Sequence, residues 1–369
     1  WPIYISLQKD GILFKMRRTQ DLPDKESATM FFQDCKLAHQ AQIAGISHSV
    51  KEILPPDLLD LTQLQKEANI RYGFTASEVY DIAQSLYEKK LISYPRTSSR
   101  YLTEDVFDSL PPIMARLLSW ELFPAAKGTG GIDISGLSRH IINAEKANVH
   151  HAIIITGIRP GNMSEKEMQV YRLVAGRMLE TFMAPCRIET TNVEAVCAAQ
   201  HFKAEQTRII EAGWHDVFMR SDMVPKSGYS VNELPEVKKG DNLNVCGCNM
   251  VHKKQLPVDP FTDAELVEYM ELNGLGTVSS RTNIIRTLVN RKYIRYSGKY
   301  IVPTPKGMFT YETIRGKKIA DTSLTADWEK QLAGFESGMI TGQDFLNRIR
   351  TLAKEMTDDI FNTYSTKEE

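Results

Sequence analysis

The sequence predicts a mixed α and β fold, in which a helical segment interrupts a β-rich part and further helices follow. Three observations carry this prediction. Apolar residues alternate with period two near the start of the chain and again from about residue 187 to 245. The period changes to 3.6 from about residue 62, and the helical pattern resumes after residue 257. Because the two β-rich stretches resemble each other, we expect the helical middle to be an insertion into one β-rich domain.

The opening stretch has the pattern of a β-hairpin. Ile3, Ile5 and Leu7 alternate with polar residues, Asp10-Gly11 supplies a turn, and apolar residues return from Ile12. A helix at about 28–42 and a strand at about 47–53 are expected next. Two prolines at 55–56 then close the segment, since proline removes a backbone donor and restricts the residue before it.

The helical middle carries start signals of the capping-box type. Thr62 with Gln65 and Thr75 with Glu78 fit this pattern. The second of these helices has a clear apolar stripe, and its members are Val79, Ile82, Ala83, Leu86 and Tyr87. Directly after it comes the segment ISYPRTSSRY at 92–101. A further capping box, Ser164 with Glu167, opens a helix that ends before Pro185.

After residue 257 the pattern predicts helix, turn, helix and wing. Thr262 with Glu265 opens the first helix, the second covers 282–290, and a hairpin follows around Ser297-Gly298.

Composition limits the class of protein. At 369 residues, of which 25% are charged and 42% hydrophobic, the chain is a globular protein of several domains. No apolar run approaches the ~20 residues of a membrane helix, and no leader opens the sequence, so we expect a cytoplasmic protein that contacts no membrane. The five cysteines lack the spacing of a four-ligand zinc site and are interpreted as core thiols.

The net charge of -1 argues against a chain that coats DNA by bulk electrostatics. A nucleic-acid site must therefore be local. Two groups of basic residues are candidates, although without an accompanying motif we would interpret each as a solvated charged surface. They are Arg96 with Arg100, and the set Arg286, Arg291, Lys292, Arg295 and Lys299.

Tyr94 is a candidate nucleophile. Pro95 fixes the backbone beside it, and Arg96 lies two residues on. A tyrosine can displace one oxygen of a phosphodiester and store the bond as a phosphotyrosine. Because a phenol has a pKa near ~10, it needs a nearby cation and a route for its proton. The planar guanidinium of Arg96 suits the phosphate oxygens better than an ammonium would.

Residues 60–102 resemble the type IA topoisomerases, particularly the bacterial topoisomerase III branch. The family motif of tyrosine, proline, arginine and a hydroxyl residue falls on 94–97. The resemblance implies that Tyr94 is the nucleophile and that Arg96 binds the phosphate. We also expect Thr97, Ser98 and Arg100 to bind DNA.

Two further segments carry the same resemblance. Residues 149–156, VHHAIIIT, are similar to the family's DHHAIIPT, which implies that His150 assists cleavage. Residues 274–281, GLGTVSSR, with the following helix and RKYI, are similar to a segment that contacts single-stranded DNA. We expect DNA contacts here from a group led by Ser280 and Arg291. Its other members are Thr277, Ser279 and Arg281.

Some family features are replaced or absent. Ser98 and Val149 stand where aspartates are usual, and Ile155 and Val278 stand where prolines are usual. Family members begin with a Toprim domain that supplies a catalytic glutamate and a DxD cluster for magnesium, and no such cluster occurs here. We therefore expect a fragment that binds no metal itself, with Mg²⁺ held by Toprim in the full enzyme.

The resemblance implies an arch domain from 1–56 and 186–256, a gate domain at 57–185 and a base domain at 257–369, with winged-helix-like gate and base. The expected activity is ATP-independent cleavage and religation of one DNA strand, with passage of another strand through the break. The expected partners are single-stranded DNA and Toprim, and the expected state is a monomer.

Two alternatives differ from this interpretation. Without Toprim the chain could act only as a single-stranded DNA-binding module. A tyrosine recombinase or type IB topoisomerase would instead need a histidine-x-x-arginine pair and then a tyrosine near the C-terminus, and no such pair follows the candidate histidines.

Overall fold

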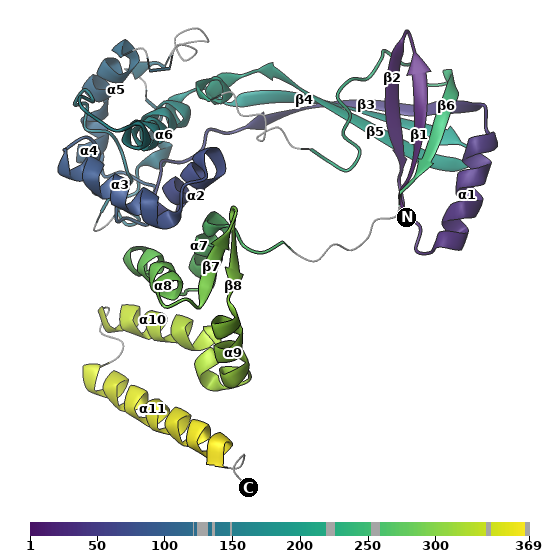
Figure 1. Cartoon of the computed structure of the whole chain (residues 1–369). Coiled ribbons are helices and arrows are strands. Elements are labelled where there is room, and N and C mark those ends of the chain that lie inside the picture. Colours follow the sequence, from purple (N-terminus) through teal and green to yellow (C-terminus); the bar gives the residue numbers. More distant parts are fainter. Residues whose placement is uncertain are drawn as a thin grey trace. The chain divides into compact units, whose positions relative to one another are not determined.

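The computed structural model divides into two compact units (Figure 1). The first consists of Trp1–Pro56, Phe123–Asp133 and Leu179–Val258, and the second of Asp57–Leu122, Ile134–Met178 and Asp259–Glu369. The structure describes every residue except 121, 124–131, 135–136, 148–149, 219–225, 252–258, 337–340 and 366–369. It confirms the mixed α and β fold class.

The first unit is built around a closed antiparallel barrel with strand order β1-β2-β5-β4-β3-β6 (Figure 1). The strands are β1 (Ile3–Lys9), β2 (Ile12–Arg18), β3 (Gln40–Ile53), β4 (Cys186–Cys197), β5 (Gln200–Glu211) and β6 (Asn242–Met250). The predicted first hairpin is confirmed, and Lys9 pairs with Ile12 across its turn. Asp10 and Gly11 have φ values of 51° and 81°, the left-handed pair that a tight two-residue hairpin turn requires.

Side chains at every second position of the strands point into the barrel and form its apolar core. Among its fully buried members are Ile3, Ile5, Leu7, Met16 and Phe202. Helix α1 (Lys25–Leu37) packs against β6 and β1.

The predicted helix at 28–42 was too long. The chain is already extended from Gln40, where Ala41 and Ile43 are buried while Gln40 and Gln42 are exposed. This two-residue alternation belongs to β3 and overrides the helical interpretation.

The second unit is mainly helical. Its principal helices are α2 (Leu61–Tyr72), α3 (Ala76–Glu88), α4 (Glu104–Asp108), α5 (Leu110–Ser119), α7 (Asp263–Leu272), α8 (Val278–Asn290), α9 (Pro305–Ile314), α10 (Thr322–Glu336) and α11 (Gly342–Ser365). Helix α6 (Glu165–Phe182) begins in the second unit and ends in the first. The predicted wing is confirmed as β7 (Ile294–Ser297) paired with β8 (Tyr300–Pro303).

The start of α2 differs from the predicted capping box. Asp60 is the N-cap, and its carboxylate accepts a hydrogen bond from the Gln63 amide at 2.7 Å. Gln65 is instead buried, and its amide donates to the Thr282 hydroxyl of α8 at 2.9 Å. An aspartate at this position is as good a cap as threonine, so the sequence offered two competing starts.

Three predicted capping boxes are confirmed. They are Thr75 with Glu78, Thr262 with Glu265, and Ser164 with Glu167. Among the described helices, none combines the length and apolar character that crossing a bilayer requires.

Asp263, the first residue of α7, also fixes the start of α3. Its buried carboxylate accepts a hydrogen bond from the Ala76 backbone amide and another from the Tyr296 hydroxyl at 3.3 Å. Burial raises the pKa of this carboxyl above its ordinary value.

We expect Asp263→Ala to lower the free energy of unfolding by about 1–3 kcal/mol, because the Ala76 amide loses its acceptor in a buried place. Urea denaturation measures the change. Asp263→Asn keeps a carbonyl oxygen for Ala76 and removes a buried charge, so its loss should be smaller. Equal losses in the two variants would contradict this account.

Glu167 ties the start of α6 to the end of α3. The Lys89 ammonium lies 2.6 Å from its carboxylate, and the Ser85 hydroxyl donates to it at 2.7 Å. Hydrogen bonds from Lys89, the Ser164 backbone amide and Ser85 lower the pKa of Glu167 to about 2, from an ordinary value of 4.5.

A carboxyl whose pKa is lower in the folded than in the unfolded protein stabilises the folded state at pH values above its unfolded-state pKa. This stabilisation disappears as the pH falls toward the folded-state pKa. The stability that Glu167 contributes should therefore be complete above about pH 4.5 and vanish toward about pH 2. Denaturation at a series of pH values should show a flatter acid dependence in Glu167→Gln than in the parent chain. Parallel curves would show that this carboxylate is not coupled to folding.

Candidate functional site

The segment that carries Tyr94 is held by a second segment, 150–156, far away in the sequence. Ser93 donates its backbone amide to the Ile154 carbonyl at 2.8 Å, and its hydroxyl accepts from the Ile154 amide at 2.9 Å. The Thr156 amide donates to the Leu91 carbonyl at 3.1 Å. These bonds fix the backbone immediately before Tyr94.

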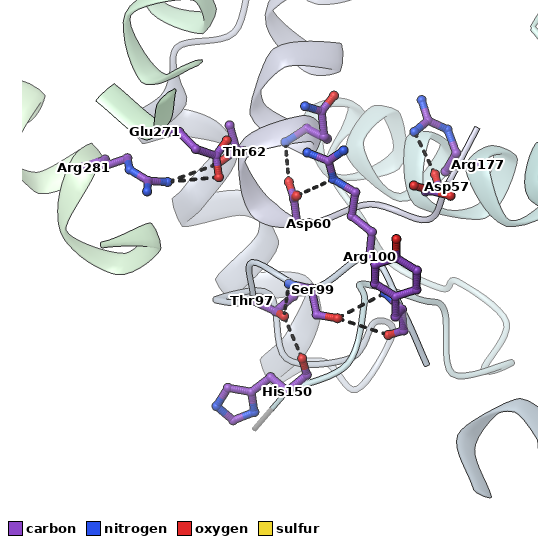
Figure 2. A network of polar contacts seen from close by, with 12 residues as sticks. Asp57, Asp60, Thr62, Thr97, Ser99, Arg100, His150, Arg177, Glu271 and Arg281 are labelled. Atoms are coloured by element: carbon purple, nitrogen blue, oxygen red, sulfur yellow. Dashed lines mark hydrogen bonds and ion pairs between the residues drawn. The ribbon is translucent and has the colours of Figure 1, made fainter. Parts of the chain in front are cut away.

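Thr97 fixes the backbone immediately after it (Figure 2). Its hydroxyl donates to the His150 carbonyl at 2.9 Å and accepts from the Ser99 amide at 3.0 Å. The Thr97 carbonyl accepts from the Leu61 amide at the start of α2, at 3.1 Å. Thr97 is buried, so the structure gives its side chain a positioning task, and its expected contact with DNA stays a prediction.

These constraints bring Tyr94 and His150 together. Their ring centroids lie 4.5 Å apart at an interplanar angle of 49°. Tyr94 is half-buried and His150 is exposed, so a ligand could reach both. A phenol beside an imidazole, on a loop that also carries an arginine two residues on, can support attack on a phosphodiester with local transfer of the phenolic proton.

Helix α3 supports both Tyr94 and Arg96. The Tyr87 ring meets the Tyr94 ring edge-on, with centroids 5.3 Å apart. The Arg96 guanidinium lies over the Tyr80 ring at 5.1 Å, and its Nη2 donates to the Gln84 side-chain oxygen at 3.3 Å. The sequence analysis missed Tyr80 and Gln84. The signal that could have found them is their spacing with Tyr87 along the helix.

Arg100 is held at the start of α2 (Figure 2). Its Nε donates to the buried Asp60 carboxylate at 2.7 Å, the same carboxylate that caps α2. Ser98 is exposed on the loop between Arg96 and Arg100. Val149, which replaces an expected aspartate, lies outside the described residues.

Arg281 reaches the same end of α2 from α8 (Figure 2). It is buried, and its guanidinium lies 3.4 Å from the Glu271 carboxylate and 3.5 Å from the Thr62 hydroxyl. The first turn of α2 therefore joins the segments that contain His150, Arg100 and Arg281.

The remaining predicted DNA ligands lie at opposite ends of α8. Thr277, Ser279 and Ser280 surround its N-terminus, where the Ser280 hydroxyl accepts from the Thr277 amide at 2.8 Å. Gly276 precedes them with φ 70°, and a Cβ there would come within 2.8 Å of the Ser280 hydroxyl. Arg291 is the exposed C-cap of the same helix. A rise of about 1.5 Å per residue separates the two ends by roughly 20 Å, so these residues do not form one cluster.

Within the described ranges, no group of three or more histidine, cysteine, aspartate or glutamate side chains is placed to hold a metal ion.

The DNA topoisomerase family profile matches residues 1–347, and the chain belongs to this family. It is a type IA, topoisomerase III-like protein. It is 32% identical over 344 residues to DNA topoisomerase 3 of Bacillus licheniformis, in a match that covers 87% of this chain and 47% of that protein. It is 30% identical over 355 residues to DNA topoisomerase 3 of Bacillus subtilis, with coverages of 89% and 48%. The chain spans about half the length of the curated relatives it matches.

The fold is similar to that of full-length topoisomerase I from Thermotoga maritima. The TM-score is 0.72 at 23% sequence identity, and the match covers 96% of this chain and 59% of that one. The likeness shows that this chain has the type IA core fold.

We expect Thr97→Val to lower the free energy of unfolding by about 1–3 kcal/mol, because the Ser99 amide loses its buried acceptor and the His150 carbonyl its donor. Thr97→Ser retains the hydroxyl and should lose less. Urea denaturation compares the two variants. A valine variant as stable as the serine variant would show that the hydroxyl does not fasten this loop.

Proposed function

We propose that this chain supplies the strand-cutting core of a type IA topoisomerase. The observation that carries the proposal is the contact between the His150 ring and the ring of Tyr94, whose own loop also bears Arg96. Tyr94 Oη attacks a phosphodiester of single-stranded DNA, so that a bond between Oη and phosphorus forms while the bond to the 3′ oxygen breaks. The 5′ phosphate stays on Tyr94 and the 3′ hydroxyl leaves.

Arg96 binds the phosphate oxygens as negative charge develops on them. His150 lies beside the phenol and assists cleavage by supporting proton movement between Tyr94 and the leaving oxygen. After another strand has passed, the 3′ hydroxyl attacks the phosphotyrosine and restores the original backbone. The bond energy is conserved in the phosphotyrosine, so religation requires no ATP.

The DNA path includes two further groups. Ser98 and Arg100 lie on the loop after Arg96, and Thr97 holds that loop. At the start of α8, hydroxyls and backbone amides form a surface suited to phosphate. We assign this second group to Thr277, Ser279 and Ser280, with Arg281 supporting it and Arg291 contacting DNA elsewhere.

The domain assignment is part of the proposal. Residues 1–56 and 186–256 form the arch, 57–185 the gate and 257–369 the base. The gate moves away from its partners while the cut is open. The chain acts as a monomer in the cytoplasm together with Toprim, which holds Mg²⁺ and supplies the catalytic glutamate.

The second candidate function is a single-stranded DNA-binding module without cleavage activity. The observation that favours it is the lack of a metal-holding group among the described residues. It predicts that this chain alone shifts labelled oligonucleotide in a gel but forms no tyrosine-linked DNA.

We expect covalent protein–DNA product when the chain is mixed with a separately made Toprim domain, magnesium and a labelled single-stranded oligonucleotide. Tyr94→Phe should abolish this product, because the phenylalanine ring has no oxygen to bond phosphorus. Denaturing gel electrophoresis measures the product.

Tyr101→Phe is the matched control, since it removes a phenol from the same segment. It should leave the covalent product intact. If Tyr94→Phe still forms the adduct, the nucleophile is misassigned. Binding by the parent chain with no adduct in any mixture would favour the module function.

A further inference from the structure

One face of α3 holds the two side chains on which the proposed reaction depends. Tyr80, Gln84 and Tyr87 are spaced by four and three residues, so they lie on the same side of the helix. The first two contact Arg96, and Tyr87 contacts the Tyr94 ring. One helix therefore positions both the proposed nucleophile, Tyr94, and the guanidinium of Arg96.

The contacts to Arg96 leave most of its donors uncommitted. The Arg96 guanidinium carbon lies over the Tyr80 ring, 5.1 Å from its centroid, and this contact with the ring occupies no hydrogen-bond acceptor. Gln84 accepts from one nitrogen, Nη2. The Arg96 Nε is buried and has no hydrogen-bond partner in the part of the chain that the structure describes. An arginine has five N–H donors in one plane, so an anion that approaches in this plane meets a guanidinium already oriented.

The partner that orients Arg96 is uncharged. Arg100 and Arg281 are each paired with a carboxylate, of Asp60 and Glu271 respectively. A carboxylate at position 84 would compete with a phosphate for the same guanidinium, whereas an amide oxygen orients the group and leaves its full charge.

Glu88 sets which way the Gln84 amide points. The Gln84 Nε2 donates to the Glu88 carboxylate, one turn further along α3, at 2.8 Å. With its nitrogen engaged there, the amide turns its oxygen toward Arg96.

We propose that Tyr80 and Gln84 are positioning residues that hold the Arg96 guanidinium ready for a DNA phosphate without neutralising it. The inference rests on the proposed function, in which Arg96 binds phosphate. It adds Tyr80 and Gln84 to the residues of the site, and it explains their chemical type. Tyr80 supplies an aromatic ring and Gln84 an uncharged hydrogen-bond acceptor.

The test is the affinity of the chain for a fluorescein-labelled single-stranded oligonucleotide, measured by anisotropy over a series of KCl concentrations. Each phosphate contact to a single strand contributes about 0.7 to the slope of log Kd against log salt. Arg96→Ala, the reference variant, should reduce the slope by about that amount. Gln84→Leu should raise Kd about fivefold to tenfold and reduce the slope toward that of Arg96→Ala.

Two shape-conserving variants separate positioning from packing. Gln84→Glu keeps the size of the side chain but pairs with Arg96, so it should bind DNA at least as weakly as Gln84→Leu. Tyr80→Phe keeps the aromatic face and should bind as the parent chain does, while Tyr80→Leu should weaken binding and flatten the slope.

Gln343→Glu is the matched control for added negative charge. Gln343 is exposed on α11 and makes the same kind of bond, to Asn347 four residues on, at 3.1 Å. The Gln343→Glu variant should bind the oligonucleotide with the same Kd as the parent chain. Thermal melting of each variant checks that it is folded.

The outcomes separate the two proposals. If Arg96→Ala leaves Kd and slope unchanged, the phosphate-binding part of the proposed function fails, and the positioning proposal falls with it. If Arg96→Ala weakens binding while the Gln84 variants and Tyr80→Leu match the parent chain, only the positioning proposal is overturned. If Gln84→Glu binds like the parent chain, the requirement for a neutral partner is refuted.

Discussion

The candidate site depends on one buried hydroxyl. Thr97 lies directly after Arg96, and its Oγ1 joins that loop to the His150 carbonyl, 53 positions away in the sequence. Ser93 makes the corresponding bonds on the other side of Tyr94. With the backbone fixed before and after it, Tyr94 has little freedom to leave His150. A single buried hydroxyl can thus determine which groups meet there.

The first turn of α2 is the junction between this loop and the rest of the second unit. Asp60 caps the helix and holds Arg100, the Leu61 amide binds the Thr97 carbonyl, and Thr62 contacts Arg281. A carboxylate at a helix N-terminus is favourable in itself, because it complements the partial positive charge of the unpaired amides. The same charge orients Arg100, so one aspartate both stabilises a helix and holds a residue of a predicted DNA-binding segment.

The sequence predicted those parts of the fold that local patterns determine. The first hairpin follows from alternation and a turn at Asp10-Gly11, and the capping box at Thr75 follows from residues three apart. The boundary between α1 and β3 was wrong, because the burial of Ala41 in the barrel depends on strands distant in the sequence. The start of α2 was misplaced for a similar reason: Gln65 is committed to Thr282 of another helix.

The candidate site was predictable only in part. Tyr94 and Arg96 are visible as a nucleophile beside a cation, but their link to His150 came from resemblance to a family. No local pattern reveals a contact across 53 positions. Arg281 illustrates the converse, since the family resemblance suggested a DNA ligand, whereas the structure buries its guanidinium beside Glu271. Its part in DNA binding stays a prediction.

The helices α2 to α6 interrupt the sequence of the barrel domain, and the place of this insertion has a mechanical consequence. They lie in the sequence between β3 and β4, which are adjacent strands, and Ile53 pairs with Cys186 at the end where the chain leaves and returns. Tension applied through both connections pulls the two strands in the same direction. It therefore does not peel them apart. The force instead slides β3 along its neighbour β6 and slides β4 along its neighbour β5. The hydrogen bonds between antiparallel strands run perpendicular to this motion, so those of each pair must break at the same time rather than in succession.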